Sequence, residues 1–257
     1  MILIICIIDN SFFFPNNKLI MKKLIFLLIA FYPFIKVYSQ TSKEHLQIGI
    51  EERKQKNYKE AIDEFNKAIL INPNYATAYY YRGNLNYDLQ NYEAAMMDYT
   101  KAIELNPSYD TAYFMRGVTK TAALSDIAGG IVDFTNAILI NPNYATAYYY
   151  RGNSKSMLND NRGAMNDYNK AIELIPRYRI AYESRGALRL DLKEYQGAFS
   201  DFNSALLINP NSGLAYCGRG MVKIAIGQKD SGCLDLSKAG ELGYSDAYPV
   251  IKKYCNP

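Results

Sequence analysis

The sequence contains one stretch of seventeen residues twice without a change. Residues 68–84 and residues 137–153 both read AILINPNYATAYYYRGN. Related stretches begin at Ala102 and Ala171, so the copies recur at intervals of about 34 residues. A chain built from equal units grows by stacking each unit on its neighbours. The repeat therefore predicts one elongated domain, and it specifies a scaffold before it specifies a ligand.

Prolines mark the boundaries between the units. Four of the five stand in an Asn-Pro pair, and each follows a helical pattern. Proline disfavours the α conformation in the preceding residue and cannot continue a helix, so each pair predicts a chain reversal. The prolines stand at positions 73, 107, 142, 176 and 210.

Between the prolines, the apolar pattern divides into two helices. The second helix carries a small, an aromatic and a small residue at positions i, i+4 and i+7, which lie on one helix face. The sets are Ala61/Phe65/Ala68, Ala95/Tyr99/Ala102, Gly130/Phe134/Ala137, Ala164/Tyr168/Ala171 and Ala198/Phe202/Ala205.

The first helix carries a glycine at a fixed place, although glycine costs up to about 1 kcal/mol inside a helix. A close approach of the second helix, opposite its small residue, would offset this cost. The six glycines are Gly49, Gly83, Gly117, Gly152, Gly186 and Gly220.

From Ser42 to Tyr244 the pattern resembles the tetratricopeptide repeat family, with its 34-residue helix–turn–helix units. The resemblance implies an all-α fold, a right-handed superhelical solenoid of helix–turn–helix repeats with a C-terminal capping helix. We expect the solenoid to occupy residues 40–257, with the cap at 245–255 and Pro249 in its first turn. The expected repeats are 42–75, 76–109, 110–144, 145–178, 179–212 and 213–246.

The third repeat departs from this pattern. It has one extra residue between Gly117 and Leu124, and Gly129-Gly130 stands where two alanines are usual in the family. We expect a bulge or an overlong turn there, followed by a softer helix.

An arginine precedes the glycine in five repeats, and an aspartate follows 16 or 17 residues later. We interpret these residues as a structural ladder of ion pairs. Because Glu64 has the acidic position in repeat 1 while Ile48 replaces its arginine, we expect pairing across repeats, with Asp235 left for Lys252 or Lys253. The expected ladder consists of Glu64, Arg82, Asp98, Arg116, Asp133, Arg151, Asp167, Arg185, Asp201 and Arg219.

In the family that the chain resembles, peptides lie along the concave face of the first helices. The resemblance therefore implies a peptide-binding groove, where Asn84 and Asn153 would clasp a peptide backbone between tyrosines. A solvated polar helix face is the alternative for these asparagines. The groove candidates are Thr77, Tyr80, Asn84, Tyr87, Thr111, Phe114, Thr146, Tyr149, Asn153 and Glu183.

The N-terminus has the composition of an export signal. Residues 21–39 combine a basic start, an apolar run and a small-residue cleavage site near Ser39/Gln40, which predicts a periplasmic or extracellular protein without a stable membrane span after cleavage. An uncleaved anchor is the alternative. Residues 1–20 lack a basic start, so we interpret them as a non-native upstream extension, with Met21 as the initiator.

Three cysteines follow this signal. In an oxidising compartment Cys233 and Cys255 would form a disulfide that ties the cap to the array. Three reduced, buried cysteines are the alternative, and Cys217 stays free in either case.

The remaining composition argues against catalysis and nucleic-acid binding. The net charge of +4 falls to +1 once four lysines and one aspartate of residues 1–39 are removed. His45 is the one histidine, at an expected packing position, and no metal-ligand cluster or phosphate loop is present in the sequence. We therefore expect a non-catalytic scaffold without a cofactor or metal that binds a protein or peptide. Binding of carbohydrate or a cell-envelope polymer by the 24 tyrosines is the alternative.

Overall fold

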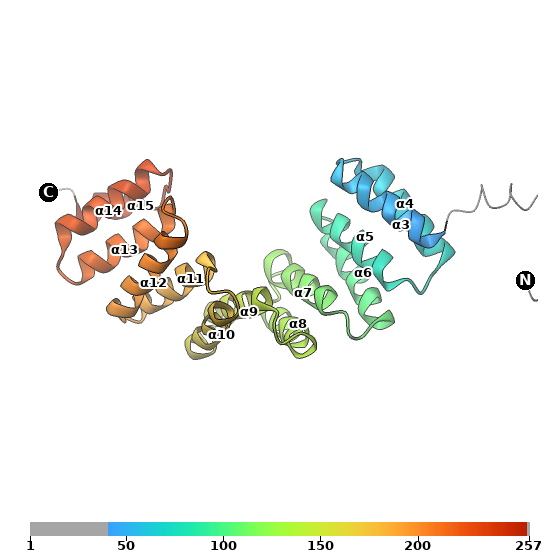
Figure 1. The fold of residues 1–257 in the computed structure, drawn as a ribbon, viewed down its shortest axis with the longest axis horizontal. Coiled ribbons are helices and arrows are strands. Elements are labelled where there is room, and N and C mark those ends of the chain that lie inside the picture. The colour runs from blue at the N-terminus through green and yellow to red at the C-terminus, as the bar shows by residue number, and fades with distance from the viewer. Residues whose placement is uncertain (1–40, 256–257) are drawn as a thin grey trace, which may run out of the picture. The chain divides into compact units, whose positions relative to one another are not determined.

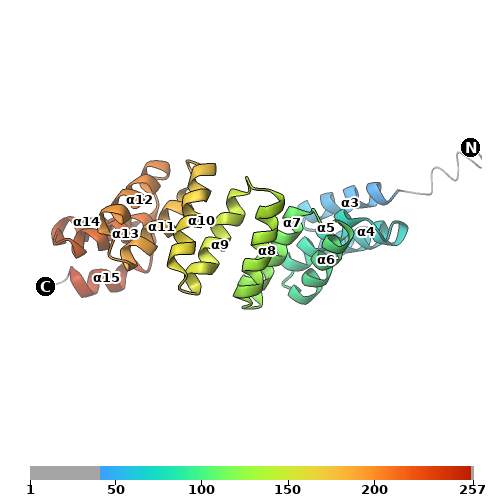
Figure 2. The same cartoon turned by 90° about the horizontal axis from the view of Figure 1, so that it is seen from below.

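The computed structural model describes residues 41–255, and these residues form helices joined by short turns. Figures 1 and 2 show them as coiled ribbons without a strand in the described part of the chain. The prediction of an all-α helical repeat solenoid is confirmed. The expected extension at 1–20, the signal at 21–39 and the cleavage site lie outside the described residues.

The chain divides into two units, of which the first ends at Tyr75. Its described part is a hairpin of two helices, α3 (Ser42–Lys54) and α4 (Tyr58–Ile71). Thr41 begins α3 with a capping box, since its side chain accepts from the Glu44 backbone N–H and the Glu44 carboxylate accepts from that of Thr41.

The second unit begins at Ala76 and contains five further hairpins and a terminal helix. Within it, each helix packs against the helix before it and the helix after it along the chain. The elements are α5 (Ala76–Asp88), α6 (Tyr92–Leu105), α7 (Asp110–Val118), η1 (Thr119–Ala123), α8 (Ile127–Ile140), α9 (Ala145–Met157), α10 (Asn161–Leu174), α11 (Arg179–Asp191), α12 (Tyr195–Ile208), α13 (Gly213–Ala225), α14 (Lys229–Glu241) and α15 (Ala247–Tyr254).

The core of each hairpin before α13 is formed by the small and aromatic residues of its second helix, and in α14 Leu236 replaces the aromatic residue. In α10, Ala164 and Ala171 are fully buried and Tyr168 is nearly so. Gly152 of α9 lies against this ring, and a Cβ atom placed on it would lie 2.9 Å from Tyr168 Cε1. The predicted close approach at the glycine is therefore present, but here it is opposite the aromatic ring and not the small residue.

The Asn-Pro pairs reverse the chain between hairpins through a local hydrogen bond. Asn106 Oδ1 accepts from the backbone N–H of Ser108 at 3.2 Å, and Asn141 and Asn209 form the same turn. This bond gives the backbone an alternative to continuing the helix, which is why asparagine is favoured there. At the fourth boundary Ile175 replaces the asparagine and the helix still ends, because Pro176 follows.

The extra residue of the third repeat is contained in the π-helix η1, so the predicted bulge is confirmed. The Asp126 N–H donates to the Lys120 carbonyl six residues earlier, whereas the corresponding bond of the next hairpin, from Asp160 to Lys155, spans five residues. Asp126 then begins α8 by accepting from the Gly129 N–H at 2.9 Å.

Candidate functional site

Each hairpin of the second unit contains a bidentate ion pair between its own two helices. In α9 and α10, Arg151 Nε donates to Asp167 Oδ2 at 2.9 Å and Arg151 Nη2 donates to Oδ1 at 2.7 Å. The Asp167 carboxylate is almost completely buried, so the hydrogen bonds from Arg151 replace those that water would donate to it. We call this arrangement the arginine–aspartate node. The other nodes are Arg82–Asp98, Arg116–Asp133, Arg185–Asp201 and Arg219–Asp235.

A further donor from the first helix completes each node. Lys155 Nζ lies 2.8 Å from Asp167 Oδ2, one helical turn beyond Arg151. In the α5–α6 hairpin the amide of Asn86 takes this place and donates to Asp98 at 3.0 Å. The equivalent cations elsewhere are Lys120, Arg189 and Lys223.

The node arginine also reaches the preceding hairpin. Arg151 Nη1 donates to Thr135 Oγ1 of α8 at 3.2 Å, and the Arg151 guanidinium carbon lies 5.4 Å from the centroid of the Tyr148 ring. Arg185 and Arg219 donate in the same way to Asn169 and Asn203. Arg151, Arg185 and Arg219 therefore each fix their own hairpin and join it to the one before.

The predicted register of the ladder was wrong. We expected Asp98 to pair with Arg116, but Arg116 binds Asp133 of its own hairpin and meets the preceding hairpin through Thr100. The expected partners of Asp235 on the cap were also wrong, because Asp235 binds Arg219 and Lys223. The guanidinium edge that forms the bidentate pair faces the second helix of the same hairpin, and one nitrogen, Nη1, is left for the neighbour.

Asp235 shows how a node acts on protonation. Burial raises the pKa of the Asp235 carboxyl, but hydrogen bonds from Arg219 and Lys223 favour the charged form more strongly, so the net shift is downward.

In the first unit, a histidine takes the role of the arginine. His45 Nδ1 lies 2.5 Å from Glu64 Oε2, and the His45 side chain is 12% exposed. Burial raises the Glu64 pKa, but hydrogen bonds from His45 and Lys67 outweigh this effect and lower it. The histidine thus pairs with an acid inside its own hairpin, at the packing position that we expected.

Three of the four aromatic groove candidates, Tyr80, Phe114 and Tyr149, pack between hairpins. Each of the three is the fifth residue of a first helix and contacts the residue that precedes the next first helix. The Tyr149 and Tyr178 ring centroids are 5.5 Å apart. We call these contacts the fifth-position pairs, and the other aromatic ones are Tyr80–Tyr109 and Phe114–Tyr144. Burial raises the pKa of Tyr109 to about 12, which shows that its hydroxyl is poorly solvated.

The fifth-position pair between α11 and α13 is polar, unlike the three aromatic pairs. Glu183 is 4% exposed and accepts from the Ser212 hydroxyl at 2.5 Å, and Arg179 binds its second oxygen. Glu183 was expected in the groove, and the structure instead buries it between two hairpins.

The asparagines of the duplicated stretch are also engaged within the fold. Asn84 is 8% exposed and accepts from the Tyr99 hydroxyl at 2.9 Å, while Asn153 accepts from Tyr168 at 2.8 Å. Each amide oxygen is thus engaged by a tyrosine of its own hairpin, and the clasp of a peptide by these asparagines stays a prediction. The remaining candidates stay partly exposed at the helix surface: Thr77, Tyr87, Thr111 and Thr146.

From α9 onward the first helices and the terminal helix α15 form a continuous face. α9 contacts α11, α11 contacts α13, and α13 contacts α15. On this first-helix face, made by α9, α11, α13 and α15, Met157 is 63% exposed and Met221 is 38% exposed. These apolar residues were not among our site candidates, although they occupy the family's groove positions.

The comparisons with known proteins agree with this architecture. The family pattern described as "Tetratricopeptide repeat" matches residues 76–109, and that described as "TPR repeat" matches residues 49–90. Residues 49–109 therefore carry tetratricopeptide repeats. No curated protein matches its sequence.

Solved structures extend the likeness over most of the length of this chain. A tetratricopeptide repeat protein from Parabacteroides merdae is 24% identical over 83% of this chain and 82% of its own, with a TM-score of 0.58. YrrB, described as having an unusual peptide-binding site, is 23% identical over 74% of this chain and 97% of its own, with a TM-score of 0.63. PilW, a type IV pilus biogenesis factor, is 15% identical over 83% and 99%, with a TM-score of 0.71. At these identities the likeness shows the fold.

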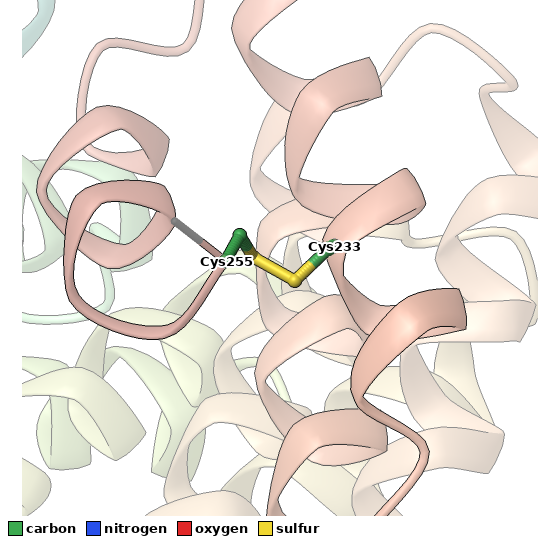
Figure 3. The surroundings of a disulfide bond; sticks show 2 residues. All are labelled: Cys233 and Cys255. Carbon is green, nitrogen blue, oxygen red and sulfur yellow. A yellow bond between two sulfur atoms is a disulfide. The ribbon is translucent and has the colours of Figure 1, made fainter. Parts of the chain in front are cut away.

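The last repeat is closed by a disulfide. Cys233 of α14 and Cys255, directly after α15, are joined in the tetratricopeptide repeat solenoid, with Cα atoms 5.6 Å apart (Figure 3). This is the first of the two alternatives that the sequence left open. Cys217 is free and buried, and burial raises the pKa of its thiol to about 11, so it stays protonated and unreactive near neutral pH.

Among residues 41–255, no group of three or more His, Cys, Asp or Glu side chains is placed to hold a metal ion. In the same range, no helix is both long enough and apolar enough to cross a membrane. The carbohydrate alternative gains no support, because Tyr80 and Tyr149 contact other rings in the fold.

Proposed function

We propose that the protein is a non-catalytic scaffold that binds an extended segment of a partner protein along the first-helix face. The observation that carries this proposal is the direct contact of successive first helices from α9 to α15, which makes one continuous surface. Met157, Leu214 and Met221 supply exposed apolar side chains on it. A helical array presents such a surface without any moving part, and repeat proteins commonly bind partners there.

The nodes support the same proposal because they leave this surface rigid. Each node arginine is held by an aspartate and a tyrosine ring, as Arg151 is by Asp167 and Tyr148, so its charge is already neutralised inside the scaffold. A partner is therefore recognised by side chains outside the nodes.

A pair of matched substitutions tests the proposal. Met157→Glu changes an exposed residue of α9, and Leu207→Glu changes an 83% exposed residue of the second helix α12. The variants are compared with the wild type on peptide and glycan arrays, and by crosslinking pull-down from the native cell envelope. We expect Met157→Glu to lose peptide signals and Leu207→Glu to keep them.

Two outcomes would contradict the proposal. One is glycan binding in the absence of peptide binding, which would favour the carbohydrate alternative. The other is a loss of peptide signals in Leu207→Glu alone, which would place the binding surface on the second helices.

We also propose that the protein is exported. A structural disulfide persists in oxidising compartments, and Cys233–Cys255 is consistent with such a place. N-terminal sequencing of the protein from the cell envelope tests this. A new N-terminus near Gln40 is expected, whereas recovery of residues 21–39 on the mature protein would support the uncleaved anchor.

A further inference from the structure

A pocket of about 370 Å³ lies at the C-terminal end of the first-helix face. Leu190 of α11 and Met221 and Ile224 of α13 form apolar parts of its wall, and Val250 and Tyr254 of α15 form another part. We call it the cap pocket. Its volume is at the lower end of the range found for ligand sites, which suits one large side chain better than a cofactor.

The α15 wall of the cap pocket depends on the disulfide. Tyr254 directly precedes Cys255, whose sulfur is bonded to Cys233 of α14 (Figure 3). Apart from this bond, α15 is held by a small apolar cluster in which Ala247 is its one fully buried residue, and by a hydrogen bond from the Tyr248 hydroxyl to the Gly240 carbonyl at 3.3 Å. A helix of eight residues has little stability of its own. The disulfide therefore keeps the Tyr254 wall in place.

Charged groups at the cap pocket favour an acidic partner. Lys193 lies in the wall, and Lys253 Nζ lies 4.8 Å from the centroid of the Tyr254 ring. Among the described residues neither lysine forms an ion pair. Asp191 is the one carboxylate in the wall and balances Lys193, so Lys253 beside Tyr254 leaves this end of the face with one further cation. A neighbouring carboxylate on the ligand would be attracted to this end of the face.

We propose that the cap pocket takes one large apolar side chain of an extended partner segment that is acidic on either side of it, and that the Cys233–Cys255 disulfide keeps the pocket formed. This inference rests on the proposed function and adds to it a position, a ligand chemistry and a dependence on oxidation. Apolar burial supplies the affinity, and the lysines supply the preference for acidic sequences.

Methyl NMR on protein labelled at its methionine methyl groups tests the site directly. The probes are three blocked peptides: acetyl-Glu-Ser-Leu-Ser-Glu-amide, the same peptide with Ser for Leu, and the same peptide with Lys for both Glu. The Leu peptide should shift the Met221 methyl signal, while Met97 and Met157, which are also exposed, stay unchanged. The Ser and Lys peptides should bind more weakly than the Leu peptide by a factor of about ten or more.

Two sets of variants separate the effect of the lysine charge on binding from the effect of the pocket wall. Lys193→Glu should weaken binding of the acidic peptide, and Lys56→Glu is its matched control, because both lysines are turn residues with positive φ after a first helix. The double variant Cys233→Ser/Cys255→Ser should reduce the Met221 response. Val250→Asp, which places a charge in the wall, should abolish it, and Val132→Asp on exposed α8 should not.

The outcomes distinguish this inference from the proposed function. If the peptides shift Met157 but leave Met221 unchanged, the cap pocket is not the site, while the first-helix face still binds peptides. If no methyl signal moves, or Val250→Asp binds as the wild type does, the cap pocket is overturned. If the cysteine double variant keeps full binding, the dependence on oxidation is overturned.

Discussion

The hairpins α9–α10 and α11–α12 share one structural device and differ in another. Both contain a node, Arg151–Asp167 in the first and Arg185–Asp201 in the second, with nearly equal distances. Their fifth-position pairs differ, because Tyr149 meets the Tyr178 ring whereas Glu183 meets a serine hydroxyl. The node is therefore the constant part of the scaffold, and the junction to the next hairpin is the variable part.

The fifth-position pairs of the second unit change from aromatic to non-aromatic along the chain. The first three fifth-position pairs of the second unit are ring contacts, the fourth is a hydrogen-bonded pair, and Cys217 has the position in α13. Rings bury more area than a carboxylate or a thiol does. The disulfide lies at the end where ring contacts at this position are missing.

The largest expected effect concerns the constant part. Asp167→Asn and Asp201→Asn should each cost about 3 to 5 kcal/mol, because both leave two cations facing a neutral group in a buried site. Hydrogen exchange, measured separately for each hairpin, gives the loss in its free energy of unfolding. Glu173→Gln, at an exposed pair with Lys170, is the control and should cost about 0.5 kcal/mol or less. Unequal losses at the two aspartates would show that the nodes are not equivalent.

Removal of the disulfide should have the second-largest effect, and the effect should be confined to the C-terminal end of the second unit. The bond closes a loop with a sequence separation of 22 residues, for which chain entropy predicts about 3 kcal/mol. In Cys233→Ser/Cys255→Ser, exchange should rise in α14 and α15 and stay unchanged in α9 and α10. Cys217→Ala, which keeps the bond, is the control. An equal rise in α9 and α10 would mean that the second unit unfolds as one cooperative body.

The variable junction should give smaller effects. Tyr149→Ala removes a half-buried ring and should cost about 2 kcal/mol. Glu183→Gln keeps an acceptor for Ser212 but loses the charge that Arg179 binds, and about 1 kcal/mol is expected. Thermal melts of both variants measure this order. A reversed order would show that the polar junction is the stronger one.

The smallest effect is a dependence on pH at the last node. The pKa of Asp235 is lowered in the folded state, so its stabilising contribution is present above the unfolded pKa of about 3.9 and is lost as pH falls further. The difference in Tm between wild type and Asp235→Asn should therefore be largest near pH 7 and shrink toward pH 3. A constant difference would indicate that Asp235 is not charged in the folded protein.

The sequence predicted the scaffold because its signals are local. The prolines end the second helices, and the extra residue after Gly117 predicts the bulge that η1 forms. The register of the ion pairs was not readable in this way, because a separation of 16 residues does not say which hairpin an aspartate belongs to in space. Ile48 at the arginine position suggested pairing across repeats. In the structure His45, one helical turn earlier, pairs with Glu64 instead.

The site was harder to predict because groove positions were assigned by number alone. Tyr80 and Tyr149 occupy family groove positions, yet their rings are large enough to reach the next hairpin and pack there. A sequence signal did exist, since a tyrosine precedes the next first helix wherever the fifth residue is aromatic, and Ser212 is found where it is Glu183. The cap pocket gave no such signal, because α11, α13 and α15 each contribute two or three residues from segments that are distant in sequence.

The π-helix η1 has a consequence for how this chain tolerates changes in length. Arg116 and Asp133 are 17 residues apart, one more than in the other nodes, and still form a bidentate pair. The surplus residue is taken up within the five positions of η1, and the ion pair that joins the two helices of this hairpin is kept. An insertion at this place in a first helix is thus absorbed locally, without loss of the bond between the helices of the hairpin.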